Sequence, residues 1–184
     1  MEEKAIPGIA PPDGRSALVL EAQSGNAEAF AELVEDCERT LYRMARTVLG
    51  NDQDCADAVQ EAITKAWLKL GSLRDPAFFR TWLIRILLNE CYKLSKRRKR
   101  PAPQTAAESV LGPGCLHDDL IDLRAALVAL PEDQRVVVAL HHVEEIPVAE
   151  IARLLRVPAG TVKSRLARAR ARLAESMRIK EERP

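Results

Sequence analysis

The chain has 184 residues, of which 47% are hydrophobic, and its formal net charge at pH 7 is +1. This length fits one domain or two small ones, and this apolar fraction excludes a wholly disordered chain. The charges are segregated: acids dominate residues 28–61, and bases dominate residues 78–100 and 151–172. Segregated charges predict separate faces for different partners.

Residues 16–100 are predicted to be helical, after a tail at residues 1–15 whose composition predicts flexibility. A short helix, a break at residues 24–26 and a long helix are expected first. Asp52 or Asp54 is expected to cap the next helix. The apolar face of that helix is expected to contain Ala56, Val59, Ile63, Trp67 and Leu70.

Aromatic and basic residues alternate in the helix expected after Pro76, a residue that suits the first turn of a helix. Aromatic side chains beside a basic groove can stack on the bases of a single strand of nucleic acid. Aromatic residues at helical spacing are also typical of a buried core, and this spacing favours the core for them here. The side chains expected in the core are Phe78, Trp82 and Ile86, with Phe79 as a further candidate.

The composition changes after Arg100, where residues 101–118 are rich in proline and glycine and predict a flexible linker. This linker separates an N-terminal domain, residues 16–100, from a C-terminal domain, residues 119–184. Helical patterns in the second domain cover residues 120–129, 132–143 and 147–155, and begin again at residue 161. Since no stretch alternates with the period of a strand, the expected fold is all-α, with two small helical domains.

The last two helical patterns, joined by the turn Val-Pro-Ala-Gly, have the layout of a helix-turn-helix unit. Residues 151–172 contain seven bases and no acid. The apolar face of the second helix is expected to contain Val162, Leu166, Ala169 and Leu173. Such a helix enters the major groove of DNA, although a solvated basic surface helix is the alternative. The candidate DNA contacts are Arg153, Arg156, Thr161, Lys163, Ser164, Arg165 and Arg168.

Motifs for secretion, membrane insertion and catalysis do not occur in the sequence. The N-terminal residues lack a basic segment followed by an apolar one, and the apolar run WLIRILL is too short to span a bilayer. His141 and His142 are adjacent, so on a helix they point about 100° apart and suit one metal ion poorly. The cysteines, Cys37, Cys55, Cys91 and Cys115, form no C-x-x-C pair and are expected to be reduced. We expect a cytoplasmic protein that is not an enzyme and uses no metal, cofactor or small-molecule substrate.

Three segments together resemble a bacterial RNA polymerase sigma factor of the extracytoplasmic-function (ECF) group, in the sigma-70 family. They are DAVQEAITKAWLKL, FFRTWLIRILLNE and PEDQRVVVALHHVEEIPVAEIARLLRVPAGTVKSRLARARARL. The resemblance covers about residues 16 to 178. It implies that the first domain reads the −10 promoter element and that the second reads the −35 element. The implied partners are core RNA polymerase, chiefly its β′ and β subunits, promoter DNA and an anti-sigma factor, without membrane insertion.

The resemblance also implies roles for particular residues. In this family the D-x-x-Q-E helix docks on the coiled coil of the β′ subunit, which here implies Asp57, Gln60 and Glu61. Residues 71–77 and the following helix match the part that captures a flipped-out promoter base, so this loop and Asn89 are expected to form two walls of one pocket. Asn89 could instead hold the loop by backbone hydrogen bonds. The implied −10 contacts are Leu73, Arg74, Asp75, Arg80, Thr81, Trp82, Arg85, Asn89 and Lys93.

A one-component helix-turn-helix regulator with its own ligand pocket is the alternative function. Such a regulator binds a palindromic duplex as a dimer. It has no use for the Asp57 helix or the Trp82 region. Duplex binding without polymerase distinguishes the two, because a repressor should bind well and a sigma factor poorly.

Overall fold

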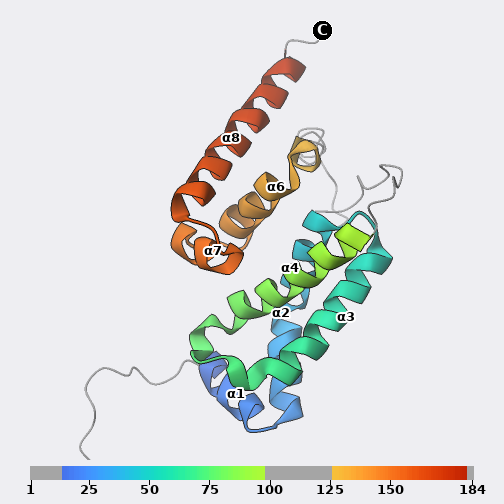
Figure 1. Ribbon diagram of the computed structural model, residues 1–184, viewed down its shortest axis with the longest axis vertical. Coiled ribbons are helices and arrows are strands. Elements are labelled where there is room, and N and C mark those ends of the chain that lie inside the picture. Colours follow the sequence, from blue (N-terminus) through green and yellow to red (C-terminus); the bar gives the residue numbers. More distant parts are fainter. Residues whose placement is uncertain (1–13, 98–125, 182–184) are drawn as a thin grey trace, which may run out of the picture.

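The computed structural model describes residues 14–97 and 126–181, with side chains as far as residue 176. The first described part contains α1 (Gly14–Gln23), α2 (Ala27–Val48), α3 (Asp52–Lys69), η1 (Leu70–Ser72), η2 (Pro76–Phe78) and α4 (Phe79–Arg97). The second contains α6 (Glu132–Val138), a π-helical turn η3 (Ala139–Val143), α7 (Val148–Leu155) and α8 (Ala159–Glu181). The described parts are helical and contain no strand, as expected (Figure 1). The predicted linker and most of the helix predicted at residues 120–129 lie outside the described residues.

The long helix α2 forms where its periodicity predicts it. Leu33, Leu41 and Met44 recur at helical spacing, and each residue is at most 1% exposed. The Asn26 side chain caps the helix by accepting a hydrogen bond from the Ala29 amide at 3.1 Å. Gly25, with φ of 101°, adopts the left-handed conformation that the turn between α1 and α2 requires.

The predicted apolar face of α3 is confirmed only in part. Leu70 is buried and Val59 and Ile63 are partly buried against the core, but Ala56 is exposed and Trp67 is 38% exposed. The centre of the buried face is instead formed by Ala58, Ala62 and Ala66, which are four residues apart. These small side chains let the α3 backbone pack closely on α4, whereas the larger apolar side chains would hold the helices apart.

The predicted cap of α3 and the predicted core aromatics also need correction. Asn51 caps α3 by accepting a hydrogen bond from the Asp54 amide at 2.8 Å, while Asp52 accepts from the Tyr42 hydroxyl at 2.6 Å. At the start of α4, Phe79 is fully buried and Phe78 is 36% exposed. η2 turns Phe79 toward the core, where it meets the ring of Phe30 edge-on at 6.5 Å. Trp82 and Ile86, also expected in the core, are only partly buried.

The helix-turn-helix unit consists of α7 and α8. Arg156 follows α7 with φ of 56°, a left-handed conformation that ends the helix and turns the chain into α8. Val162, Leu166 and Ala169 of α8 are buried, and Leu173 is partly buried, which confirms the predicted apolar face.

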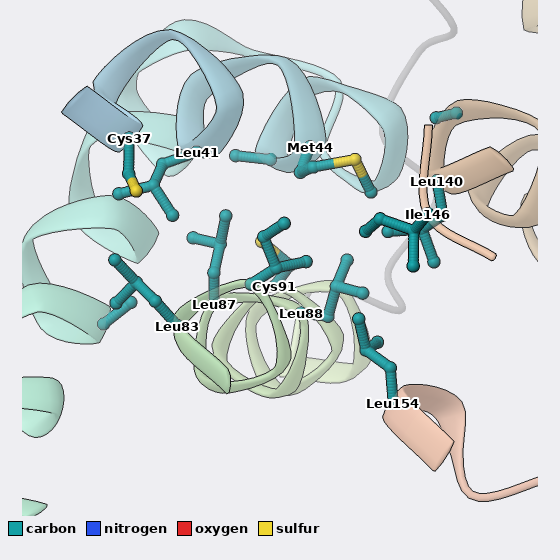
Figure 2. Close-up of a cluster of buried hydrophobic side chains, with 14 of the residues drawn as sticks. Cys37, Leu41, Met44, Leu83, Leu87, Leu88, Cys91, Leu140, Ile146 and Leu154 are labelled. Atoms are coloured by element: carbon teal, nitrogen blue, oxygen red, sulfur yellow. The ribbon is translucent and has the colours of Figure 1, made fainter. Parts of the chain in front are cut away.

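The two helical groups pack against each other through a continuous apolar core. Figure 1 shows α6 and α7 beside α2 and α4, and α8 running alongside α6, away from α2 and α4, toward the C-terminus. In Figure 2, Leu140, Ile146 and Leu154 approach the cluster formed by Met44, Leu88 and their neighbours. The loop after η3 and helix α7 therefore cover part of the N-terminal group.

The three cysteines in the described parts, Cys37, Cys55 and Cys91, are buried free thiols. Burial raises the pKa of the Cys55 thiol to about 11 and that of Cys91 to about 12, and it also raises the pKa of Cys37. A raised pKa leaves less thiolate, the reactive form, at neutral pH.

We expect these thiols to react slowly with a disulfide reagent while the protein is folded. For Cys55, a pKa near 11 in place of 9.0 leaves about 100-fold less thiolate at pH 8, before steric protection is counted. Reaction of Cys115→Ser with 5,5′-dithiobis(2-nitrobenzoate), with and without guanidinium, measures this. The rate should rise with pH toward 11, and thiols that react as fast folded as unfolded would contradict the buried environment.

Candidate nucleic-acid and polymerase interfaces

The N-terminal half of α8 presents basic and hydroxyl side chains outside its buried face. Lys163 and Arg168 are exposed. The Ser164 hydroxyl donates to the Thr161 carbonyl at 3.0 Å, and Arg165 Nε lies 3.0 Å from Asp133 Oδ2 on α6. The Asp133 contact holds one edge of the Arg165 guanidinium.

The two remaining helix-turn-helix candidates lie on or next to α7. Arg156 is exposed at the turn. Arg153 is exposed too, but its guanidinium carbon lies 5.2 Å from the centre of the Phe78 ring. This cation–π contact joins a predicted −35 residue to the start of α4 in the N-terminal group.

One face of α3 is polar and exposed along its whole length, and we call it the α3 stripe. It consists of Asp57, Gln60, Glu61, Thr64 and Leu68. Gln53 donates to the Asp57 carboxylate at 3.1 Å, and Lys65 pairs with Glu61 at 2.6 Å. Leu68 is 75% exposed, so the stripe ends in a large unburied apolar side chain. The sequence analysis missed Leu68, although its position eleven residues after Asp57 places it on the same face.

A second face, partly exposed at its start and exposed from Asn89 onward, runs along α4, and we call it the α4 stripe. Its members recur at intervals of three and four residues, on one side of the helix: Trp82, Arg85, Asn89, Lys93 and Lys96. The C-terminal part of the stripe borders a groove of about 570 Å³ between α3 and α4. Lys65 and Lys69 of α3 line its other side, so four lysines surround the exposed Asn89 amide. We call this the lysine groove; local periodicity did not reveal that α3 contributes to it.

Glu90 joins the two helices beneath the lysine groove. Its carboxylate accepts from Lys65 Nζ at 2.7 Å and from Lys93 Nζ at 2.8 Å. Burial by itself would raise the pKa of Glu90, but the hydrogen bonds from the two ammonium groups lower it below its ordinary value. Glu90 therefore remains ionised at neutral pH and positions both lysines at the groove.

The loop at residues 71–77 and Asn89 line two different cavities, contrary to the expectation that they form two walls of one pocket. Leu73 is buried, and Asp75 uses its carboxylate to cap η2 by accepting from the Ala77 amide at 3.0 Å. Gln23 holds the loop by donating to the Leu70 and Leu73 carbonyls at 3.0 and 2.8 Å. Arg74 is exposed. The hydrogen-bonding role weighed for Asn89 thus belongs to Gln23.

A smaller cavity of about 170 Å³ lies at the other end of α4, away from Asn89. The N-terminal group contributes Leu73, Phe78, Thr81, Trp82 and Arg85 to its lining. The rest comes from α7: Glu150, Arg153 and Leu154. Several predicted −10 contacts therefore face the C-terminal helices.

The acids Glu144 and Glu150 contact two of these predicted −10 residues. Arg80 pairs with Glu144, and the Thr81 hydroxyl donates to the Glu150 carboxylate. Neither acid stands out in the sequence, because each partner is more than sixty residues away in the chain.

In the described parts of the chain, no group of three or more histidine, cysteine, aspartate or glutamate side chains has a geometry that could hold a metal ion. His141 Nδ1 lies 3.2 Å from the Ile146 carbonyl instead. None of the described helices has the length and apolar character needed to cross a membrane.

An all-helical fold that ends in a basic helix-turn-helix defines a DNA-binding protein. Comparisons with known proteins narrow this class. A family model described as Sigma-70 region 2 matches residues 33–101, and one described as Sigma-70, region 4 matches residues 120–173. The ECF RNA polymerase sigma factor SigM of Mycobacterium tuberculosis is 37% identical over 153 residues, covering 82% of this chain and 78% of SigM. The chain therefore belongs to the ECF sigma factors, transcription initiation factors that direct core RNA polymerase to promoters.

Further relatives have the same designation. The ECF sigma-E factor of Escherichia coli K12 is 32% identical over 170 residues. The match covers 83% of this chain and 88% of the sigma-E factor. Among solved structures, CnrH in complex with the cytosolic domain of CnrY has a TM-score of 0.70 at 30% identity, covering 91% of this chain and 99% of CnrH. The sigma factor RpoE of Bartonella quintana, in complex with the anti-sigma factor NepR, has a TM-score of 0.72 at 27% identity. The match covers 85% of this chain and 100% of the RpoE chain. These similarities confirm the family resemblance and the fold class.

Replacing Arg165 or Arg168 by alanine is expected to weaken selection of the −35 element. An arginine bound to guanine through two hydrogen bonds contributes about 1–3 kcal/mol of discrimination, whereas a phosphate contact lowers affinity for all sequences equally. Holoenzyme binding to a promoter and to its −35 mutant measures this preference. Arg172→Ala, which removes an exposed charge further along α8, is the matched control. Affinity lost without loss of preference would make that arginine a phosphate contact.

Proposed function

We propose that the α3 stripe docks on the β′ subunit of core polymerase, that the α4 stripe and the lysine groove bind the −10 element, and that the N-terminal half of α8 reads the −35 element. The observation that carries this proposal is the separation of an acidic and polar face on α3 from basic faces on α4 and α8. The corresponding domains are residues 16–100 and 119–184, joined by a linker at residues 101–118.

The α3 stripe suits a protein partner better than DNA. Asp57 and Glu61 give it negative charge, which repels phosphates, and Leu68 adds apolar area at its end. An interface commonly combines an apolar anchor with a polar rim. Leu68 is thus proposed as the anchor of the polymerase interface, with Gln60 and the two acids beside it.

The lysine groove suits one strand of DNA. Its lysines supply phosphate contacts, and the Asn89 amide offers two donors and an acceptor to a base edge. Such an edge becomes accessible when the base leaves its pair. Arg85 and Trp82, toward the start of α4, add a further charge and an aromatic face to the same path.

The first half of α8 suits the major groove. Lys163 and Arg168 are exposed, and Thr161, Ser164 and Arg165 are partly exposed, on the sides of the helix outside its buried face, where an inserted helix meets base edges and phosphates. Arg153 and Arg156 flank the turn and are proposed as phosphate contacts of the −35 duplex.

The protein is proposed to act in the cytoplasm, where RNA polymerase acts, without catalytic activity of its own. An anti-sigma factor is proposed as a further partner, since the Bartonella quintana relative is solved in complex with one.

Run-off transcription tests the proposal. Core polymerase with this protein should produce a defined transcript from the promoter upstream of the protein's own gene, and core polymerase alone should not. The protein without polymerase should bind the same duplex poorly. Tight binding of a palindromic duplex by a dimer, without transcription, would overturn the proposal in favour of a one-component regulator.

A further inference from the structure

We propose that the C-terminal helices inhibit the N-terminal ones through an intramolecular lock, in which the carboxylates of Glu144 and Glu150 occupy the start of the −10 face. This inference rests on the proposed function, in which α4 binds −10 DNA, and on the family resemblance, which implies Arg80, Thr81 and Trp82 among the −10 contacts. Promoter DNA and the C-terminal helices then compete for the same side chains. We call the contacts of the two acids the carboxylate lock.

Glu144 is the centre of the lock. Its side chain is 0% exposed, although it lies between η3 and α7, outside both helices. The carboxylate accepts from the Thr40 hydroxyl at 2.9 Å, from Arg43 Nε and Nη2 at 3.1 and 2.9 Å, and also from Arg80. Two arginines and a hydroxyl around an anion are the groups that commonly bind a phosphate. Glu144 therefore takes, on Arg80 of α4, the place that a DNA phosphate would take, and Thr40 and Arg43 of α2 hold it there.

Glu150 covers the next turn of α4. It accepts from the Thr81 hydroxyl, and together with Arg153 and Leu154 it closes the small cavity beside Trp82. Arg153 stacks on Phe78 at the same place. The start of α4 is thus covered by α7, while Asn89 and the lysine groove remain open at the other end.

Apolar packing and one backbone contact complete the interface. Ile146 and Leu154 approach Met44 and Leu88 in Figure 2. On α6, Arg135 Nε donates to the Thr47 carbonyl at 2.7 Å. Contacts from three C-terminal segments make this packing a defined arrangement of the free protein.

The closed arrangement cannot be the one that binds a promoter. The −10 and −35 elements are about 25 base pairs apart, or roughly 85 Å at 3.4 Å per base pair. In the closed protein α7 of the −35-reading unit lies directly on α4 of the −10-reading unit. A buried ion pair adds little net stability, because desolvation offsets its attraction, so the lock specifies the closed geometry and can still open.

The lock is tested by neutralising its acids in the full-length protein. Glu144→Gln with Glu150→Gln keeps the side-chain shape but can place an amide N–H beside the arginine donors around Glu144 and another beside the Thr81 hydroxyl. Glu145→Gln is the matched control, since Glu145 is the exposed neighbour of Glu144. Thr40→Val is a second test from the opposite side of the interface, because it removes one donor to Glu144, and Thr40 is not itself a proposed DNA contact, although its hydroxyl also accepts from Arg80 at 3.1 Å. Two measurements are made without polymerase: the affinity for fluorescein-labelled (dT)12, and the radius of gyration by small-angle X-ray scattering.

The double variant should bind (dT)12 at least tenfold more tightly than the wild type and have a larger radius of gyration. Thr40→Val should shift both in the same direction by less, and the control should match the wild type within twofold. Unchanged affinity and radius in the double variant and in Thr40→Val would overturn the lock. If the double variant loses helical circular dichroism, Thr40→Val decides alone. Run-off transcription by the wild type is measured separately, so a result that overturns the lock does not contradict the proposed function.

Discussion

Replacing Asp57 and Gln60 together by alanine is expected to lower the affinity for core polymerase by at least tenfold. Both side chains are exposed on the α3 stripe, so the loss falls on the partner and not on the core. A hydrogen bond to a charged group contributes about 1.5–3 kcal/mol, and about 1.4 kcal/mol corresponds to tenfold in affinity. Competition with a labelled sigma factor for core polymerase measures the change.

The free energy of unfolding should not fall, because alanine is the best helix former and neither side chain is buried. Glu175→Ala, which removes one exposed negative charge from α8, is the control for net charge. If the double variant competes as well as the wild type, the α3 stripe is not the polymerase interface. Leu68→Ala should then also be neutral, whereas the proposed anchor role predicts a loss of similar size.

Asn89→Ala is expected to damage promoter opening more than polymerase binding. The Asn89 amide is exposed in the lysine groove, where it can read a base that has left its pair. Loss of such a reading contact costs about 1–3 kcal/mol of discrimination at one base. Holoenzyme binding to single-stranded −10 oligonucleotides, with each base varied in turn, should show one position that loses its preference.

Lys93→Ala is the matched comparison for Asn89→Ala. Lys93 lies one turn further along the same stripe and has no base-reading amide, so its removal should weaken all oligonucleotides equally. The loop at residues 71–77 should keep its structure in both variants, because Gln23 holds it. If Asn89→Ala weakens every oligonucleotide equally, or none, base reading by Asn89 is wrong.

The sequence by itself determined the features that depend on local periodicity. The helical class, the buried face of α8 and the helix-turn-helix layout follow from residues three and four positions apart, and these are confirmed. The family could be predicted too, because three motifs occur in a fixed order along the chain. The D-x-x-Q-E helix exposes Asp57, Gln60 and Glu61, as the family resemblance requires for a docking face.

The tertiary structure alone decided which face of each helix is buried when several faces are apolar. On α3, Ala58 and Ala62 are buried in place of Ala56, because small side chains allow close packing on α4. Phe79 rather than Phe78 enters the core, because the orientation of η2 depends on the helices against which it packs. Periodicity counts apolar residues, but it does not say how near the neighbouring helix can come.

Contacts between distant residues were equally beyond the sequence. Glu144 meets Thr40 across 104 positions and Thr81 meets Glu150 across 69, and no local pattern distinguishes these acids from solvated ones. A charged side chain is expected at the surface, because burying it costs free energy unless hydrogen-bond donors surround it. Only the folded chain brings those donors together, and so only the tertiary structure revealed that the start of α4, part of the proposed −10 face, is in contact with the helix-turn-helix.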